Sequence, residues 1–141
     1  MKLEQQVATL EQSKKLKELG IGFESLFSYS WDWLCQPESD SILILTDVVA
    51  RSWCSYPAPT AEEIAELLPA NFCIGSREYN WEISKGGGDK YYKLRCQQYF
   101  AYGPPALLKE FINKSLTQAL ASMLIWLIEN NHINSEELNG K

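Results

Sequence analysis

Cysteine and histidine are the side chains that most often supply a nucleophile or a metal ligand, and this chain has four cysteines and one histidine. The cysteines stand singly and far apart, with no C-x-x-C pair; they are Cys35, Cys54, Cys73 and Cys96. A four-cysteine zinc site normally brings its ligands in close pairs. We therefore predict no metal and no cofactor, and we expect the cysteines to stay free and to serve as core residues.

Two other features could suggest catalysis. His132 falls just past the last predicted helix, and nothing in the sequence places a cysteine or an acid beside it. The run Gly86–Gly88, followed by Asp89 and Lys90, lacks the spacing of a phosphate-binding loop and precedes a strand rather than a helix. We interpret the histidine as a helix-end residue and the glycines as a turn, and we predict no catalytic residue.

The most distinctive segment is rich in aromatic residues. Over residues 23–34 the aromatic side chains alternate with polar ones, which predicts a strand with one mostly apolar face. This strand and one later tryptophan give the candidate ligand or partner surface: Phe27, Tyr29, Trp31, Asp32, Trp33 and Trp53. Two alternatives stay open. The aromatic residues could form core or an oligomer interface, or they could enclose Asp32 in a pocket.

Three segments begin with a capping pattern, in which Thr or Ser is followed three residues later by Glu or Gln: Thr9–Gln12, Thr60–Glu63 and Ser115–Gln118. They predict helices over about residues 10–19, 61–68 and 116–130. Gly20 follows the first helix, where a positive φ carries no steric cost, and Ile21 would then contact Leu16. The last helix is the most apolar, so we expect it at the centre of the fold or in a subunit contact.

Two segments predict further strands. Residues 42–45 form a short apolar run, which predicts a buried strand. Residues 79–96 predict a hairpin in which Ile83 faces Tyr92, Trp81 faces Leu94 and Glu82 faces Lys93. The expected fold is therefore α+β: a small antiparallel sheet, including the hairpin near 79–96, packed with about three helices. We expect a single domain over residues 1–141, with a frayed tail near 134–141.

The charge and hydropathy of the chain limit the kinds of partner that it is expected to bind. The formal net charge is -5, and the first 20 residues contain no apolar stretch of the kind found in signal peptides. The longest strongly apolar run, Met123–Ile128, is far too short to span a bilayer. We predict a cytoplasmic protein that binds neither membrane nor nucleic acid.

Three segments together resemble a known group of proteins. They are Thr9 to Gly20 (TLEQSKKLKELG), Ala58 to Pro69 (APTAEEIAELLP) and Ser115 to Ile133 (SLTQALASMLIWLIENNHI). The order of two capped helices, a hairpin and an apolar helix resembles small uncharacterised proteins encoded by bacterial phages and prophages. The resemblance covers roughly a third of the chain. It implies a viral or mobile-element origin, with no known activity and no catalytic residues.

These observations favour a non-enzymatic interaction or accessory protein that binds a protein partner or associates with itself. The alternative is a small-molecule binder or enzyme that uses a carboxylate such as Asp32 in an aromatic pocket. A nucleic-acid-binding protein is the third hypothesis, and the acidic net charge makes it the least favoured.

Overall fold

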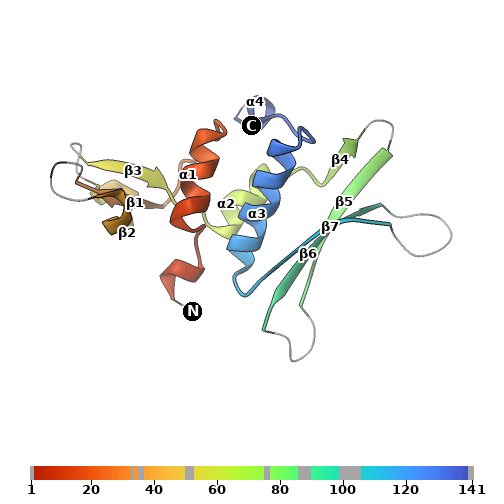
Figure 1. Cartoon of the computed structure of the whole chain (residues 1–141), viewed down its shortest axis with the longest axis horizontal. Helices are drawn as coiled ribbons and strands as arrows, with labels where there is room; N and C mark the ends of the chain where they lie inside the picture. Colours follow the sequence, from red (N-terminus) through yellow and green to blue (C-terminus); the bar gives the residue numbers. More distant parts are fainter. Residues whose placement is uncertain are drawn as a thin grey trace.

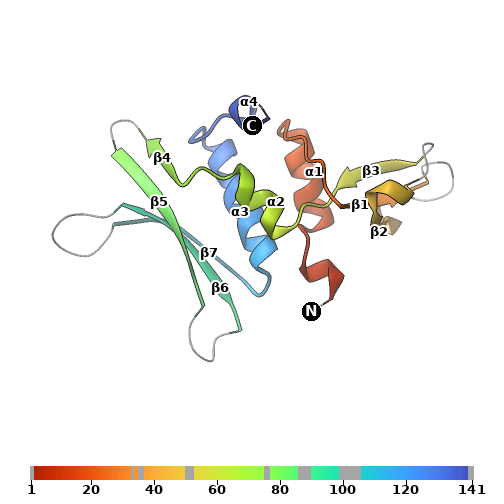
Figure 2. The same ribbon diagram turned by 180° about the vertical axis from the view of Figure 1, so that it is seen from behind.

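The fold of this chain places its helices between two separate antiparallel sheets. The computed structural model describes residues 2–32, 34, 37–49, 53–74, 77–85, 90–98 and 106–139. Strands β2, β1 and β3 form a three-stranded sheet, and strands β4 to β7, in that order, form a four-stranded sheet. Helices α1, α2 and α3 lie between them (Figures 1 and 2). The predicted α+β class is confirmed.

Helix α1 (Leu10–Glu18) begins and ends as its sequence predicts. The Gln12 backbone N–H donates to Thr9 Oγ1, and the Thr9 N–H donates to Gln12 Oε1, both at 3.1 Å. At the other end Gly20 has φ +86°, and the Ile21 N–H donates to the Leu16 carbonyl at 3.0 Å. These bonds satisfy backbone groups that a helix otherwise leaves unpaired at its ends.

Helices α2 (Ala61–Leu67) and α3 (Leu116–Glu129) are also capped by the predicted residues, Thr60 and Ser115. The last residue of each capping pattern makes a longer-range contact. The Leu26 N–H donates to Glu63 Oε1 at 3.3 Å, and Gln118 Nε2 donates to the Glu4 carbonyl at 3.3 Å. The capping residues of both helices therefore also tie them to the N-terminal quarter of the chain.

The main core surrounds α3, whose stripe packs against α1, α2 and the four-stranded sheet. Its most completely buried large side chains are Leu16, Ile64, Leu94, Leu120, Met123, Leu124 and Leu127.

The last segment differs from the prediction of a frayed tail, because Ser135–Asn139 forms a short helix, α4. Leu138 is 3% exposed, and burial of this side chain against the core favours an ordered helix here. None of the helices in the described part of the chain is long and apolar enough to cross a membrane.

The three-stranded sheet consists of β1 (Phe27–Trp31), β2 (Ile42–Leu45) and β3 (Cys54–Pro57). The central strand β1 is shorter than the predicted strand over residues 23–34. The prediction that β2 is buried is wrong, since Ile42 and Leu45 are 46% and 45% exposed. The reason is that β2 is an edge strand, which pairs with β1 on one side only.

The four-stranded sheet consists of β4 (Asn71–Ile74), β5 (Arg77–Ser84), β6 (Tyr92–Gln98) and β7 (Ala106–Asn113). The predicted hairpin is present as β5 and β6, but its predicted register is wrong by two residues. Ile83 faces Leu94, Trp81 faces Cys96 and Glu82 faces Arg95. A shift of two keeps every side chain on its predicted face, so the alternation alone could not distinguish the two registers.

The observed register has a physical reason in the next strand. It places Arg95 opposite Glu82 on one side and opposite Glu110 of β7 on the other. Arg95 Nε donates to Glu110 Oε2 at 2.7 Å. The register therefore places one cation between two carboxylates, an arrangement that the hairpin sequence alone does not contain.

Candidate functional site

Three of the aromatic residues singled out in the sequence lie on one face of β1. Phe27 and Tyr29 are half-buried, and Trp31 is 9% exposed. The Trp31 ring packs on Tyr56 of β3, with 5.0 Å between ring centroids. The Tyr29 hydroxyl donates to the Ala8 carbonyl at 2.8 Å, and burial is the main reason that its pKa is raised. These contacts attach β1 to β3 and to the segment before α1.

Asp32 and Trp53, two further members of the predicted surface, lie next to the ends of strands of the same sheet. Asp32 is half-buried just after β1, and its Oδ1 accepts a hydrogen bond from the Leu34 N–H at 3.1 Å, which closes a local turn. Trp53 lies half-buried in the bend before β3. Trp33 lies outside the described residues. The structure thus brings together Phe27, Tyr29 and Trp31 and gives Asp32 a partner of its own.

The cysteines differ from one another in exposure. Cys96 of β6 is fully buried, and this burial raises the pKa of its thiol to about 11, which makes it a poor nucleophile. Cys54 and Cys73 are exposed, so the expectation that they are core residues is wrong: β3 and β4 are edge strands. Cys35 lies outside the described residues. Within the described ranges, no three His, Cys, Asp or Glu side chains are grouped as a metal site.

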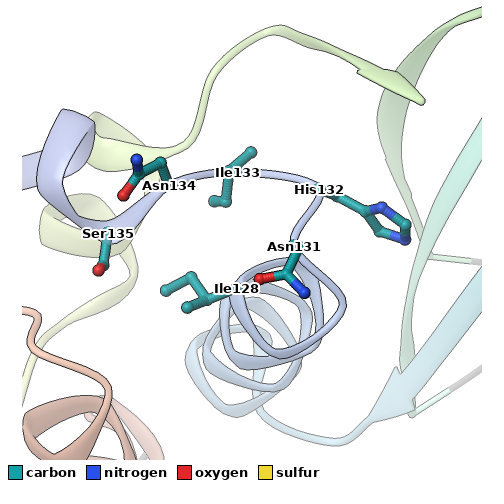
Figure 3. A pocket seen from close by; sticks show the side chains of 6 residues that line it. All are labelled: Ile128, Asn131, His132, Ile133, Asn134 and Ser135. Atoms are coloured by element: carbon teal, nitrogen blue, oxygen red, sulfur yellow. The ribbon is translucent and has the colours of Figure 1, made fainter. Parts of the chain in front are cut away.

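A polar hollow of about 470 Å³ lies where α3 meets α4. Figure 3 shows Asn134 and Ser135 on one side of it and the His132 ring pointing away, towards the strands. That ring packs edge-on to Trp126 at 4.9 Å and beside Phe72 at 6.1 Å between centroids. The histidine therefore packs between α3 and the four-stranded sheet, and the hollow offers neutral amide and hydroxyl groups.

A second depression, which we call the acidic groove, has a different chemistry. It has a volume of about 490 Å³ and lies where the starts of α2, α3 and β6 meet the N-terminal segment. Its apolar side chains are Leu26, Ala61, Tyr92 and Leu116. Its carboxylates are Glu62, Glu63 and Glu66, all from α2. Its remaining groups are neutral and polar: Gln5, Gln6, Thr60 and Thr117.

The local sequence of α2 explains why these carboxylates lie together. Ile64 and Leu68 are one turn apart and are buried in the core, so they fix which side of the helix faces inward. Glu62 and Glu66 are also one turn apart, and both are exposed. Thr60 caps the helix and accepts the Glu63 N–H at 3.3 Å. The cap and the buried stripe together place the acidic face of α2 along the groove.

Glu63 has one oxygen engaged and one available. Its Oε1 accepts the Leu26 N–H, whereas its Oε2 is buried and has no hydrogen-bond partner among the described residues. A buried carboxylate oxygen without a partner is costly. No lysine or arginine lines the groove in the described part of the chain. One recorded cation contacts a lining residue: Lys85 Nζ lies 4.6 Å from the centre of the Tyr92 ring.

The sequence interpretation missed this groove. It used Glu63 only as part of a capping pattern, and it gave no role to Leu26, which is 58% exposed at the groove. A usable signal was present, since Glu62 and Glu66 share a helix face opposite the buried stripe. Comparison of the chain with protein-family models, curated proteins and solved structures finds no match. Function is therefore inferred from the chemistry of the groove.

Proposed function

We propose that this chain is a non-enzymatic interaction protein whose acidic groove binds a cationic, apolar segment of a protein partner. The observation that carries the proposal is the composition of the groove. It combines four apolar side chains with three carboxylates, and among its described lining residues there is no cation to neutralise them. An apolar floor beside uncompensated negative charge suits a segment in which Lys or Arg alternates with apolar residues.

Both the apolar and the charged groups of such a segment have matching side chains in the groove. The alkyl stem of a lysine or arginine can lie on Leu26 and Leu116 while its charged head reaches the carboxylates. Glu63 lines the groove and adds a third negative charge there. Glu62 and Glu66 are exposed, so they attract the cation over a longer range and raise the association rate. The same carboxylates repel phosphate, which favours a protein partner over a nucleic acid.

The proposal is tested with a fluorescein-labelled peptide of alternating Lys and Leu, whose binding is followed by anisotropy. We expect saturable binding that weakens as salt is added, because salt screens exposed charges. The double variant Glu62→Gln, Glu66→Gln keeps the shape of both side chains, and we expect it to weaken binding by about tenfold. The matched control is Glu78→Gln, which removes one exposed carboxylate from β5, outside the groove.

Two results would overturn the proposal. One is binding that the groove substitutions leave unchanged, which would place the site elsewhere. The other is equal binding of a peptide that alternates Glu and Leu, because an apolar patch without charge selection would explain it. Loss of binding in the Glu78→Gln control as well would show that net charge, rather than the groove, controls the interaction.

A further inference from the structure

A hollow of opposite charge adjoins the acidic groove. We call it the cationic hollow; it has a volume of about 360 Å³, and its lining includes Tyr91, Ile112 and Lys114. Tyr91 and Ile112 are 45% and 54% exposed, which is high for large apolar side chains. Lys114 Nζ lies 5.6 Å from the centre of the Tyr91 ring. None of the described residues that line this hollow is acidic.

The two depressions lie on either side of the start of α3. Gln5 lines both of them. Tyr91 lines the cationic hollow and its neighbour Tyr92 lines the acidic groove, because successive residues of an extended chain point to opposite sides. Each depression pairs exposed apolar area with charge of one sign, and the signs are opposite. Such a surface is complementary to a copy of itself turned by half a rotation.

Three other described cations are already paired with carboxylates within the chain. Lys14 Nζ lies 3.4 Å from Glu38, Lys15 Nζ lies 3.8 Å from Glu129, and Arg95 is bonded to Glu110. Lys114 has no carboxylate among its recorded contacts within the described ranges and lies against an aromatic ring. It therefore presents the combination of positive charge and apolar surface that the acidic groove selects.

We propose that a second copy of this chain fills the acidic groove, in a two-fold symmetric dimer whose axis passes near Gln5. In this dimer Lys114, Tyr91 and Ile112 of each copy meet Glu66, Glu62 and Leu26 of the other. The inference rests on the proposed function and names the partner that supplies the cationic, apolar segment. Because the interface is isologous, every contact occurs twice.

The test is the molar mass of the full chain in solution, measured by sedimentation velocity over a range of concentrations at low and high salt. We expect a dimer at low salt that dissociates as salt is added. Glu66→Lys and Lys114→Glu should each raise the dimer dissociation constant by about a hundredfold, since each substitution opposes like charges at two places and each place contributes about tenfold. A chain that carries both substitutions restores the opposite-charge pairs, so its dissociation constant should return towards the original value.

Matched controls separate this interface from a general charge effect. Glu78→Lys on β5 and Lys109→Glu on β7 make the same changes of charge at exposed residues outside both depressions. We expect both to leave the dissociation constant within about twofold of the original. Circular dichroism of each variant shows whether the chain is still folded. All four substituted side chains are exposed, so we expect unchanged spectra.

Several outcomes would overturn the dimer. A monomer at all concentrations at low salt would do so, and if the Lys–Leu peptide still binds in a Glu66-dependent manner, the proposed function stands without it. A dimer that neither substitution weakens would place the interface elsewhere. A series of oligomers larger than a dimer would indicate a head-to-tail contact instead of a two-fold one. A monomer that binds a labelled single-stranded oligonucleotide through Lys114 would assign the cationic hollow to a polyanion.

Discussion

The two sheets differ in how they are attached to the rest of the molecule. The four-stranded sheet contributes Phe72, Leu94 and Cys96 to the main core around α3. Among the described residues, none of β1, β2 or β3 belongs to that core. The three-stranded sheet is joined to α1 and its lead-in by polar and ring contacts instead, including the Tyr29 hydroxyl on Ala8 and Lys17 on the Tyr56 ring. It extends away from the helices on the side opposite the other sheet (Figure 2).

This difference shows that aromatic content does not by itself locate the core. The most aromatic strand, β1, buries Ser28 and Ser30 more completely than its aromatic neighbours, to 2% and 0% exposure. Both serines lie in the middle strand of the sheet, and the Ser28 hydroxyl is hydrogen-bonded to the Thr46 hydroxyl at 2.8 Å. By contrast α3 has few aromatic residues, but its aliphatic stripe forms most of the core. The four-stranded sheet is therefore expected to be more strongly coupled to global stability than the three-stranded sheet.

The largest expected effect is on global stability. Leu94 of β6 is completely buried, so Leu94→Ala should lower the free energy of unfolding by about 2–5 kcal/mol. Leu43 is half-buried on the edge strand β2, and we expect Leu43→Ala to lower it by less than about 1.5 kcal/mol. Urea denaturation followed by circular dichroism measures both changes. Equal losses would contradict the difference between the two sheets.

The second prediction uses one cysteine from each sheet. Cys54 of the three-stranded sheet is exposed, whereas Cys96 of the four-stranded sheet is buried and its thiol pKa is raised from 9.0 to about 11. At pH 8 the pKa difference alone lowers the thiolate fraction of Cys96 by about a hundredfold, and burial slows labelling further. We expect iodoacetamide to label Cys54 in the native protein and Cys96 only in urea. Peptide mass spectrometry distinguishes the sites, and rapid native labelling of Cys96 would show that the four-stranded sheet opens readily.

A smaller effect is expected from the contact between Tyr29 and Ala8. Tyr29→Phe removes the hydroxyl that donates to the Ala8 carbonyl, and it should lower the free energy of unfolding by about 0.5–1.5 kcal/mol near neutral pH. Burial, followed by the charge of Glu4, raises the pKa of Tyr29 above that of the unfolded chain. The folded state therefore holds this proton more tightly, and the associated stability is present below about pH 10 and is lost as pH rises through the folded pKa.

The pH dependence gives this prediction its control. Because Phe cannot ionise, the variant should lose less stability than the original protein when pH rises above about 10. Urea denaturation of both proteins at neutral and alkaline pH measures this difference. Equal losses of stability in the two proteins at alkaline pH would mean that ionisation of Tyr29 does not contribute to the loss. An unchanged free energy of unfolding near neutral pH would mean that the hydroxyl contact with Ala8 does not stabilise the fold.

The parts of the fold that the sequence predicts are those whose interacting groups lie close together along the chain. The caps of α1, α2 and α3 join residues three apart, and the stop at Gly20 joins Ile21 to Leu16. The hairpin register depends on Glu110, which belongs to a strand outside the hairpin. The exposure of β2 depends on its position at the sheet edge, which its apolar sequence does not encode.

The candidate site was harder to predict for the same reason. The acidic groove is assembled from segments as far apart as Gln5 and Thr117, although its three glutamates all come from α2. The aromatic alternation of β1 is local and was easy to detect, so it gave the predicted surface. Part of that surface, Trp31, packs on Tyr56 and is nearly buried. A pattern within one segment thus predicts a helix or strand well. Prediction of a site requires knowing how several segments are arranged in space.

The most direct test of the proposed function is to locate the Lys–Leu peptide on the protein by nuclear magnetic resonance, with the chain labelled by nitrogen-15. We expect saturable shift changes at the backbone amides of Leu26, Glu66 and Leu116, which border the acidic groove, and smaller changes along β1. The Glu62→Gln, Glu66→Gln variant should lose these changes at the same peptide concentration. Changes confined to Tyr29, Trp31 and Tyr56, with the groove amides unmoved, would assign binding to the aromatic sheet and contradict the proposal.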